Sequence, residues 1–365
     1  MNYEELLRRT AAGAAPDTAE IARLLQAPDE AAEQALFAAA YEVKKEYCSN
    51  LVNLRGLIEF SNICTRDCLY CGIRKSNRKV SRYQMSIDEI VAAARCAGEF
   101  GYGSVVLQSG ERSDPEFVEQ VTEILRQIAA LPWDLGVTLS CGEQSPETYR
   151  QWREAGAKRY LLRIESSDPE IFARIHPPEC HYRDRVAALE RLKTAGYQVG
   201  TGVMIGLPEQ TWEHLAADID FFRRMDADMI GMGPYLPQDD TPLGVQHPDL
   251  PGMAEQRLQM ALRMIAVTRL VLRDVNIAAT TALQAIDPES GRERGILAGA
   301  NVIMPNVGDV AHRRDYQLYN GKPDLDENSA QVRQKLLDSL ARIGERPRFN
   351  AHGDPEHFFT RMKQR

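Results

Sequence analysis

Short apolar runs alternate with longer amphipathic segments along most of the chain after residue 50. The apolar runs cover residues 54–60, 103–108, 136–140, 159–165, 198–206, 228–233, 275–280 and 300–305. Segments of helical length lie between most of them, such as 86–100 and 211–225, where apolar side chains recur every three or four positions. Ser86 and Glu89 have the spacing of a capping box and mark the start of a helix. Short strands joined by helical crossovers predict a parallel sheet.

Eight strand–helix units are the number that closes a barrel, so the predicted fold class is α/β, a (β/α)8 TIM barrel with an N-terminal helical extension and a C-terminal helix. Residues 1–50 show helical spacing and form the predicted extension. The barrel is expected over 51–345. The segment "LLDSLARIGERPR", residues 336–348, is interpreted as the closing helix, and 346–365 as a C-terminal tail.

Composition narrows the classes of protein that fit. The chain has 365 residues, 44% of them apolar, and its net charge of −8 argues against a nucleic acid or a membrane surface as partner. Its apolar runs are shorter than the roughly 18–20 residues that span a bilayer, and the N-terminus lacks the apolar core of a signal peptide. Seven cysteines, mostly scattered, suggest a reducing cytoplasm rather than a disulfide framework.

Three cysteines gather directly after the first predicted strand. Cys64, Cys68 and Cys71 follow the spacing C-x3-C-x2-C, and the other four cysteines are isolated. A closed zinc site needs four ligands, so zinc would require a distant His or Cys. A [4Fe–4S] cluster held by three thiolates would instead leave one iron open to a ligand. The active sites of such barrels lie at the C-terminal ends of the strands, which places this cluster at the catalytic mouth.

The fourth predicted strand, "RYLLRIE", carries charge on one face. Side chains alternate across a strand, so Arg159, Arg163 and Glu165 are expected to point into the barrel, and Tyr160 toward the outer helices. Buried charges are costly unless they are paired or bind a charged ligand. They therefore indicate either a structural ion pair or an anionic substrate bound by the two arginines. By the same alternation Thr138 also points inward.

The cysteine spacing, with Tyr70 before the last cysteine, resembles the radical S-adenosylmethionine (SAM) superfamily. "QSGE" at 108–111 and "GVMIGLPEQT" at 202–211 resemble two further stretches of that family that approach SAM. The resemblance implies that the open iron chelates the amino and carboxylate groups of SAM. Reductive cleavage of the sulfonium would then give methionine and a 5′-deoxyadenosyl radical.

From about residue 50 to 320 the chain resembles one branch more closely, the [FeFe]-hydrogenase maturase HydE family. The matching segments are "RGLIEFSNICTRDCLYCGIRKSN", "VVLQSGE", "AGAKRYLLRIESSDPEIFARI", "MIGLPEQT", "DMIGMGPYLPQDDTPL", "IAATTA", "GANVIMPN" and "YQLYNGK". The resemblance implies a substrate that is a cysteine-bound iron carbonyl–cyanide unit, with other hydrogenase maturases and an electron donor as partners. Some relatives carry a second cluster on three cysteines after the last segment. This chain has no cysteine there, so a second cluster is not expected.

The resemblance also implies roles by position. The residues implied around SAM are Tyr70, Ser109, Glu165, Arg185, Met204, Leu236 and Tyr316. The residues implied around the substrate are Gln108, Thr138, Arg159, Arg163, Met229, Thr280, Thr281 and Met304. Arg185 is expected to pair with the methionyl carboxylate, because a guanidinium matches a carboxylate in shape and charge.

Three other functions can be compared with this sequence. A methylornithine synthase has the same barrel and no second cluster, and its amino-acid substrate could also use arginines in the cavity. Biotin synthase would need cysteines within the second, third and fifth strands, where this sequence has none. A non-catalytic Fe–S or zinc scaffold would bind no SAM and would tolerate the loss of Glu165 and Arg185.

Overall fold

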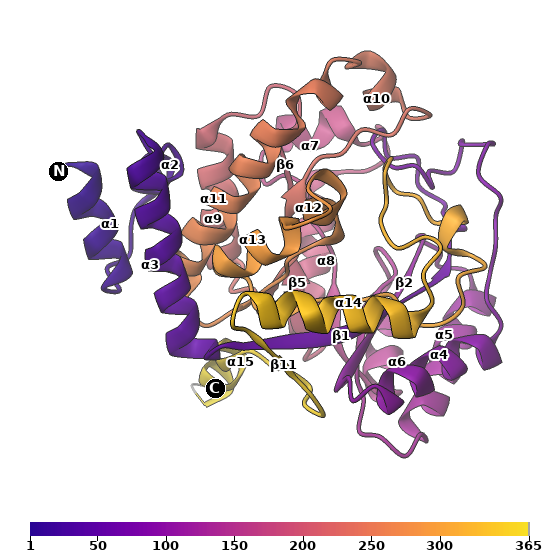
Figure 1. Ribbon diagram of the computed structural model, residues 1–365. Helices are drawn as coiled ribbons and strands as arrows, with labels where there is room; N and C mark the ends of the chain where they lie inside the picture. Colours follow the sequence, from indigo (N-terminus) through magenta and orange to yellow (C-terminus); the bar gives the residue numbers. More distant parts are fainter. Residues whose placement is uncertain (364–365) are drawn as a thin grey trace.

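Eight parallel strands form a closed barrel in the computed structural model, which describes residues 1–363 (Figure 1). In spatial order they are β10 (Val302–Ile303), β1 (Leu51–Ser61), β2 (Ser104–Ser109), β3 (Gly136–Ser140), β4 (Ala157–Leu161), β5 (Gln198–Thr201), β7 (Met229–Ile230) and β9 (Asn276–Ile277). The barrel closes between β9 and β10, where the amide of Asn301 donates to the carbonyl of Ile277 at 2.9 Å and the amide of Ala279 to Val302 at 2.9 Å. The predicted fold class is confirmed.

Two of the predicted strands are each divided into two short pieces. β6 (Met204–Ile205) continues β5, and β8 (Gly233–Pro234) continues β7, so that Met204 pairs with Gly233. At the break the two backbones approach closely, because a Cβ atom on Gly202 would lie only 2.0 Å from the carbonyl oxygen of Gly231. Glycine at this position therefore allows the fifth and sixth strands to touch at the mouth of the barrel.

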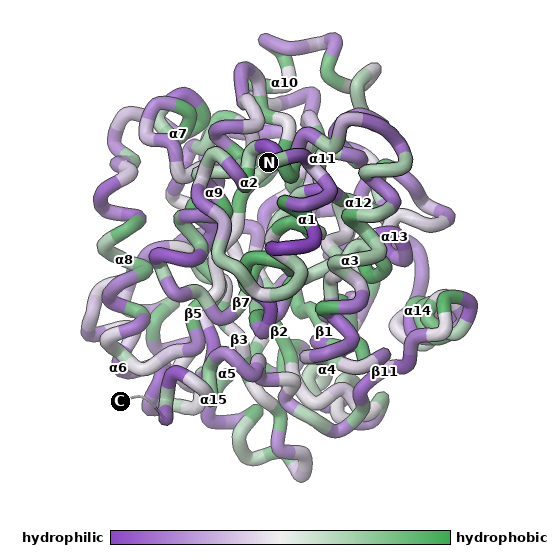
Figure 2. The backbone as a smooth tube through the Cα atoms, turned by 90° about the vertical axis from the view of Figure 1, so that its left-hand side faces the viewer, coloured by the Kyte–Doolittle hydropathy of each residue, from purple (hydrophilic) through white to green (hydrophobic). Residues whose placement is uncertain are grey.

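Helices surround the barrel. They are α4 (Ile87–Glu99), α5 (Pro115–Ala129), α6 (Pro146–Glu154), α7 (Pro169–Ile175), α8 (Tyr182–Thr194), α9 (Trp212–Arg224), α10 (Pro242–Gln246), α11 (Ala254–Leu272), α12 (Thr281–Ile286), α13 (Gly291–Leu297) and α14 (Ser329–Arg342). The predicted capping box of Ser86 and Glu89 starts α4. Hydrophobic stretches concentrate in the strands and the helices facing them (Figure 2). None of the helices in residues 1–363 combines the length and apolar character needed to cross a bilayer.

The outward face of β4 packs as its alternation predicts. Tyr160 is fully buried and lies among aromatic rings of the outer layer, 5.2 Å from the ring of Tyr149 and 6.5 Å from that of Trp152 between centroids. Its hydroxyl donates to the carbonyl of Gly142 at 2.7 Å, which satisfies the polar end of the side chain. This packing fixes which face of β4 points into the barrel.

The N-terminal extension consists of three helices on one side of the barrel (Figure 1). They are α1 (Tyr3–Ala11), α2 (Thr18–Leu25) and α3 (Glu30–Cys48). They pack mainly on α9 and α11, where Arg263 bonds to Glu33 at 2.6 Å. At the end of α3 the buried ammonium of Lys44 pairs with Glu345, which joins the extension to the C-terminal region.

The C-terminal region differs from the prediction. The closing helix α14 ends at Arg342 rather than running to 348, and residues Arg346–Arg348 form β11, which pairs in parallel with the start of β1. Gly344 has a φ of +75°, which ends the helix, and Pro347 cannot continue one. The chain then crosses beneath the N-terminal ends of the strands and finishes in α15 (Glu356–Lys363) (Figure 1). The tail thus closes the bottom of the barrel.

Candidate active site

A cavity of about 310 Å³ lies at the C-terminal ends of the strands. The sequence-predicted residues that line it are Cys64, Cys68, Tyr70, Cys71, Gln108, Ser109, Arg163, Glu165, Arg185, Met204, Leu236, Thr280, Thr281, Met304 and Tyr316. They come from all around the barrel, as expected for side chains at strand ends and in the loops that follow. The geometry therefore brings the three thiols and most of the implied cofactor and substrate residues into one space.

The three cysteines lie in a loop that the surrounding backbone holds firmly. Thr65 donates to the carbonyl of Glu111 through both its amide, at 2.8 Å, and its hydroxyl, at 2.9 Å. A Cβ atom on Gly110 would lie 2.4 Å from the carbonyl oxygen of Ile63 and 2.8 Å from the Cβ of Cys64. The turn after β2 thus needs glycine in order to pack against the start of the cysteine loop.

Arg82 braces the same loop from inside. Its guanidinium donates to four carbonyl groups, those of Asn62 at 2.6 Å, Ile73 at 2.8 Å, Arg74 at 2.6 Å and Asn77 at 3.1 Å. These carbonyls belong to the two ends of the loop, so one guanidinium holds both ends of a half-buried segment together. The loop is therefore preformed by the protein itself.

Burial disfavours the ionised form of all three thiols. It raises the pKa of Cys71 to about 12, raises the pKa of Cys68 well above its usual range, and raises that of Cys64 less strongly. Buried thiols ionise when a cationic group binds between them. Within residues 1–363 no group of three His, Cys, Asp or Glu side chains is gathered as ligands of a single metal ion. Three thiols around one cavity fit a polynuclear iron–sulfur cluster with one iron left open.

Arg185 lies beside the cysteine loop and is held by two acceptors. Its Nε atom donates to Oε1 of Glu143 at 2.6 Å, and its Nη1 atom donates to the carbonyl of Arg163 at 2.5 Å. Although burial opposes it, the Glu143 carboxylate raises the pKa of Arg185 above its ordinary value. Arg66 joins this network through an ion pair with Glu111. A fixed cation next to the thiols is suited to bind the carboxylate of an amino-acid cofactor.

Glu165 takes an unusual backbone conformation at the end of the fourth strand. Its φ is +66°, in the left-handed region that costs a residue with a side chain about 1–3 kcal/mol. Hydrogen bonds with the fifth strand fix this turn: the amide of Glu165 donates to Gly202 and the amide of Met204 to Glu165, each at 3.0 Å. Its Oε2 atom lies 2.8 Å from Nη2 of Arg163 without hydrogen-bond alignment and remains unsatisfied. The turn therefore presents a buried acceptor to the cavity.

The opposite wall holds an ion pair that the sequence reasoning missed. Lys322 pairs with Glu59, and its Nζ atom also donates to the carbonyl of Tyr316 at 2.9 Å. Next to them the hydroxyls of Thr281 and Tyr319 are 2.8 Å apart. A signal for Glu59 was present, since it is the one carboxylate inside the apolar run of the first strand. Strand alternation places it on the same face as Leu57, which also lines the cavity.

Three predicted substrate residues, Arg159, Thr138 and Met229, do not line the cavity, and this placement is corrected. Arg159 is the third residue of β4, and Arg163 lies two residues beyond the end of that strand. At about 3.3 Å per residue of extended chain, the offset of four residues corresponds to about 13 Å. At the bottom of the barrel Arg159 forms an ion pair with Asp354 of the tail and donates to the carbonyl of His352 at 2.7 Å. The alternation predicted the correct face of the strand for Arg159, but not its position along the barrel axis.

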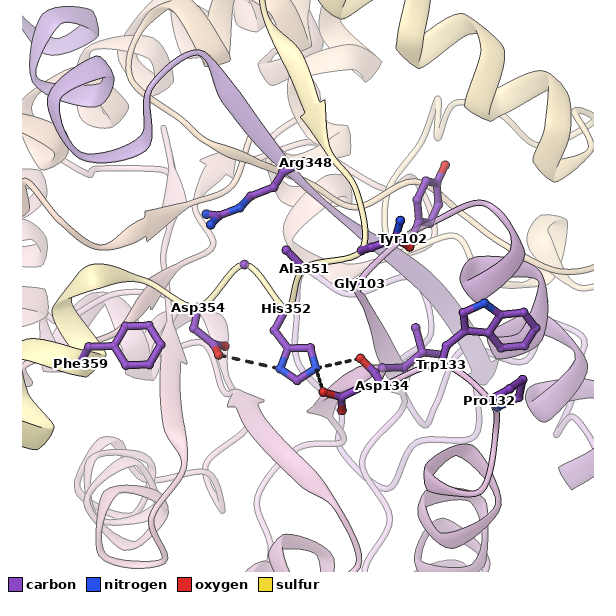
Figure 3. Close-up of a pocket in the computed structure, with 13 residues that line it drawn as sticks. Tyr102, Gly103, Pro132, Trp133, Asp134, Arg348, Ala351, His352, Asp354 and Phe359 are labelled. Atoms are coloured by element: carbon purple, nitrogen blue, oxygen red, sulfur yellow. Dashed lines mark hydrogen bonds and ion pairs between the residues drawn. The ribbon is translucent and has the colours of Figure 1, made fainter.

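A second hollow of about 540 Å³ lies at this lower end, between the tail and the loops that precede β2 and β3 (Figure 3). His352 reaches across it, with Nε2 2.8 Å from the carbonyl oxygen of Asp134 and Nδ1 4.0 Å from Oδ2 of Asp354. Trp133 and Phe359 supply aromatic walls on either side. None of the predicted site residues lines it, and it is at the end of the barrel opposite to where such enzymes react.

Comparison with known proteins agrees with the geometry. Residues 58–222 match the radical SAM superfamily. The chain is 40% identical over 320 residues to the [FeFe] hydrogenase maturase subunit HydE of Thermotoga maritima, covering 87% of this chain and 88% of that protein. It is 26% identical to a 3-methylornithine synthase of Methanosarcina acetivorans, covering 90% and 89%. The crystal structure of methylornithine synthase (PylB) superposes with a TM-score of 0.80 at 24% identity, covering 94% of this chain and 98% of that one.

Proposed function

The chain belongs to the [FeFe]-hydrogenase maturase HydE family of the radical SAM superfamily, and from this premise we propose which of its residues carry out the reaction. It is an enzyme of the hydrogenase maturase type that uses a [4Fe–4S] cluster and SAM. We assign the cluster to Cys64, Cys68 and Cys71. When bound, the cluster and SAM supply one-electron reductive cleavage of the SAM sulfonium and the radical chemistry that follows. The protein itself binds and orients the cluster and SAM and excludes water from them.

Arg185 and Glu165 are the proposed polar anchors for SAM. Arg185 is fixed by Glu143 beside the cysteine loop, where it can take the methionyl carboxylate. Glu165 offers an unsatisfied buried oxygen to a hydroxyl donor such as the ribose. Tyr70, Ser109, Met204, Leu236 and Tyr316 line the same space and would provide the contacts around the rest of the molecule. An apolar lining with a few fixed polar groups is typical of cofactor sites.

The proposed substrate is a cysteine-bound iron carbonyl–cyanide unit, placed deeper in the cavity. The observation that supports this proposal is that the thiols and the guanidinium-bearing Arg163 line one cavity. Cyanide and carboxylate groups make such a unit anionic, and the planar guanidinium of Arg binds anions with good geometry. Gln108, Thr280, Thr281 and Met304 line the same region. Lys322 adds a second cation there that the sequence did not predict.

We further propose that other hydrogenase maturases and a protein electron donor are its partners, and that it works in the cytoplasm. None of the seven cysteines, all of which lie within residues 1–363, forms a disulfide, and an open cluster needs reducing surroundings. One relative carries the name of a hydrogenase maturase subunit, which supports a shared assembly task.

Anaerobic reconstitution tests the proposal. The wild-type protein is expected to bind about four irons, to change its reduced EPR spectrum on addition of SAM, and to release 5′-deoxyadenosine. Cys71→Ser is the control and should do none of these. Turnover is then compared on the cysteine-bound iron carbonyl–cyanide complex and on lysine. Conversion of lysine alone would assign the methylornithine synthase reaction to this protein. An EPR spectrum that does not change on addition of SAM would indicate a non-catalytic scaffold instead.

A further inference from the structure

The loop that follows the last cysteine carries a concentration of positive charge. Residues 72–82, "GIRKSNRKVSR", contain five Lys or Arg and no Asp or Glu, although the whole chain has a net charge of −8. This loop is the purple segment that runs from the barrel mouth down to α4 on the right of Figure 1. The loop holds no acidic residue that could pair with these cations, so any ionic partner of theirs lies outside the loop.

Two of these cations remain free to meet a partner. Arg74 pairs with Asp67 at 2.9 Å and Lys79 pairs with Asp240, so both are already used inside the protein. Lys75 and Arg78 are exposed, and no ion pair formed within residues 1–363 includes either of them. Their charges therefore project from the surface of an otherwise acidic protein.

The loop is also close to the cysteines and rigid. The amide of Arg74 donates to the carbonyl of Cys71 at 3.1 Å, and the amide of Asn77 donates to Arg74 at 3.0 Å. Two consecutive turns thus join the last cysteine to Asn77, the residue before Arg78. The amide of Lys75 is bonded to the carbonyl of Arg66 at 2.8 Å, and Arg82 braces the loop from inside. A partner that docks here would lie beside the cysteine loop without having to order it first.

We propose that Lys75 and Arg78 form the docking surface for a small acidic protein that carries a low-potential one-electron centre. The inference rests on the proposed function, because a reaction that consumes one electron per cleavage needs such a donor. One electron passes from the docked centre, which is oxidised by one electron, to the cluster, which is reduced by one. Opposite charges steer the two proteins together and fix the donor beside the cysteines.

Charge reversal at the two positions tests this surface. The variant K75E/R78E is compared with wild type in two assays of SAM cleavage, one driven by an acidic reduced flavodoxin and one by dithionite. A matched control, R346E/R348E, makes the same change of charge on β11 at the opposite end of the barrel, where Figure 3 draws Arg348. Neither pair of residues lines the active-site cavity.

With flavodoxin at low salt, K75E/R78E is expected to lose at least about tenfold in the rate at limiting donor, and to lose the dependence on salt that wild type shows. The dithionite-driven rate should stay at the wild-type level, and the control should behave as wild type in both assays. An unchanged flavodoxin rate in K75E/R78E overturns the docking surface, as does an equal loss with dithionite. A wild-type protein inactive with dithionite would instead contradict the proposed function.

Discussion

Arg185 and Glu143 are joined by a 2.6 Å hydrogen bond between Nε and Oε1 at the edge of the cysteine loop. Arg185 comes from α8 and Glu143 from the loop after β3, so the contact ties two separate strand–helix units together at the mouth. Arg185 is only 7% exposed, and a second bond to the carbonyl of Arg163 fixes its other arm. The position of its guanidinium is therefore set before SAM arrives.

The first prediction concerns this positioning role of Glu143. Glu143→Gln keeps the shape but removes the charge, and a hydrogen bond to a charged group contributes about 1.5–3 kcal/mol. We expect SAM to bind about tenfold more weakly to the reconstituted variant, measured by equilibrium dialysis. Arg185→Met should weaken binding further, because it removes the cation itself. Glu147→Gln, on the exposed face of α6, is the control and should bind SAM as wild type does. Normal affinity in Glu143→Gln would exclude the role.

The second prediction separates the two arginines of the fourth strand. Arg159→Met removes a fully buried cation and leaves Asp354 without its partner, so it should lower the free energy of unfolding by about 3 kcal/mol. Adding Asp354→Asn should restore part of this loss, because the orphaned charge is removed. Arg163 pairs with Glu165 but is partly exposed, so Arg163→Met should lower the unfolding free energy by less than Arg159→Met does, and it should impair turnover of the substrate. Denaturant unfolding and turnover assays check both, and a stable, inactive Arg159→Met would reverse the assignment.

The same two arginines show how far sequence reasoning reached. The apolar runs predicted all eight strands, and the alternation along the fourth strand placed Arg159 and Arg163 on the inner face. The alternation of side chains indicates which face of a strand a residue lies on, but not its position along the barrel axis. It could not show whether an arginine lies at the C-terminal or the N-terminal end of the strands. The depth of Arg159 is set by a tail more than 190 residues later, whose Asp354 gives no signal by itself. Lys322 was missed for a similar reason, since its partner Glu59 is distant in sequence.

The third prediction is a pH dependence of the tail. His357 in α15 bonds to Asp226 at 2.7 Å and to Asp274 at 3.1 Å, and these two carboxylates raise the pKa of His357 to about 9. A histidine whose pKa is raised on folding stabilises the native state below its unfolded pKa of about 6.5, and the contribution is lost as the pH rises through about 9. Arg361 and Lys193 also form ion pairs with Asp226.

The melting temperature checks this prediction. His357→Gln should melt below wild type at pH 6, and the difference should shrink as the pH is raised from 6.5 past 9. His247→Gln, whose imidazole forms none of the ion pairs found in residues 1–363, serves as the control and should show no such trend. A difference in melting temperature that is constant from pH 6 to pH 10 would contradict the assigned pKa.

The fourth prediction tests the contact between the turn after β2 and the cysteine loop. In Gly110→Ala the added methyl group would lie 2.4 Å from the carbonyl oxygen of Ile63 and 2.8 Å from the Cβ of Cys64, so the backbone must move. Because Cys64 is the first of the three thiols, a shift of this segment should spoil the ligand geometry while the rest of the barrel folds. We expect less than about half of the wild-type iron after reconstitution, measured by iron analysis and cluster absorbance, together with a melting temperature within a few degrees of wild type for the cluster-free protein. Gly252→Ala is the matched control, since apart from its neighbours in the chain no described residue has an atom within 4 Å of the added methyl group there. Full iron content in Gly110→Ala would show that the loop can adjust to the methyl group, and that the close approach of these two segments is not what places Cys64.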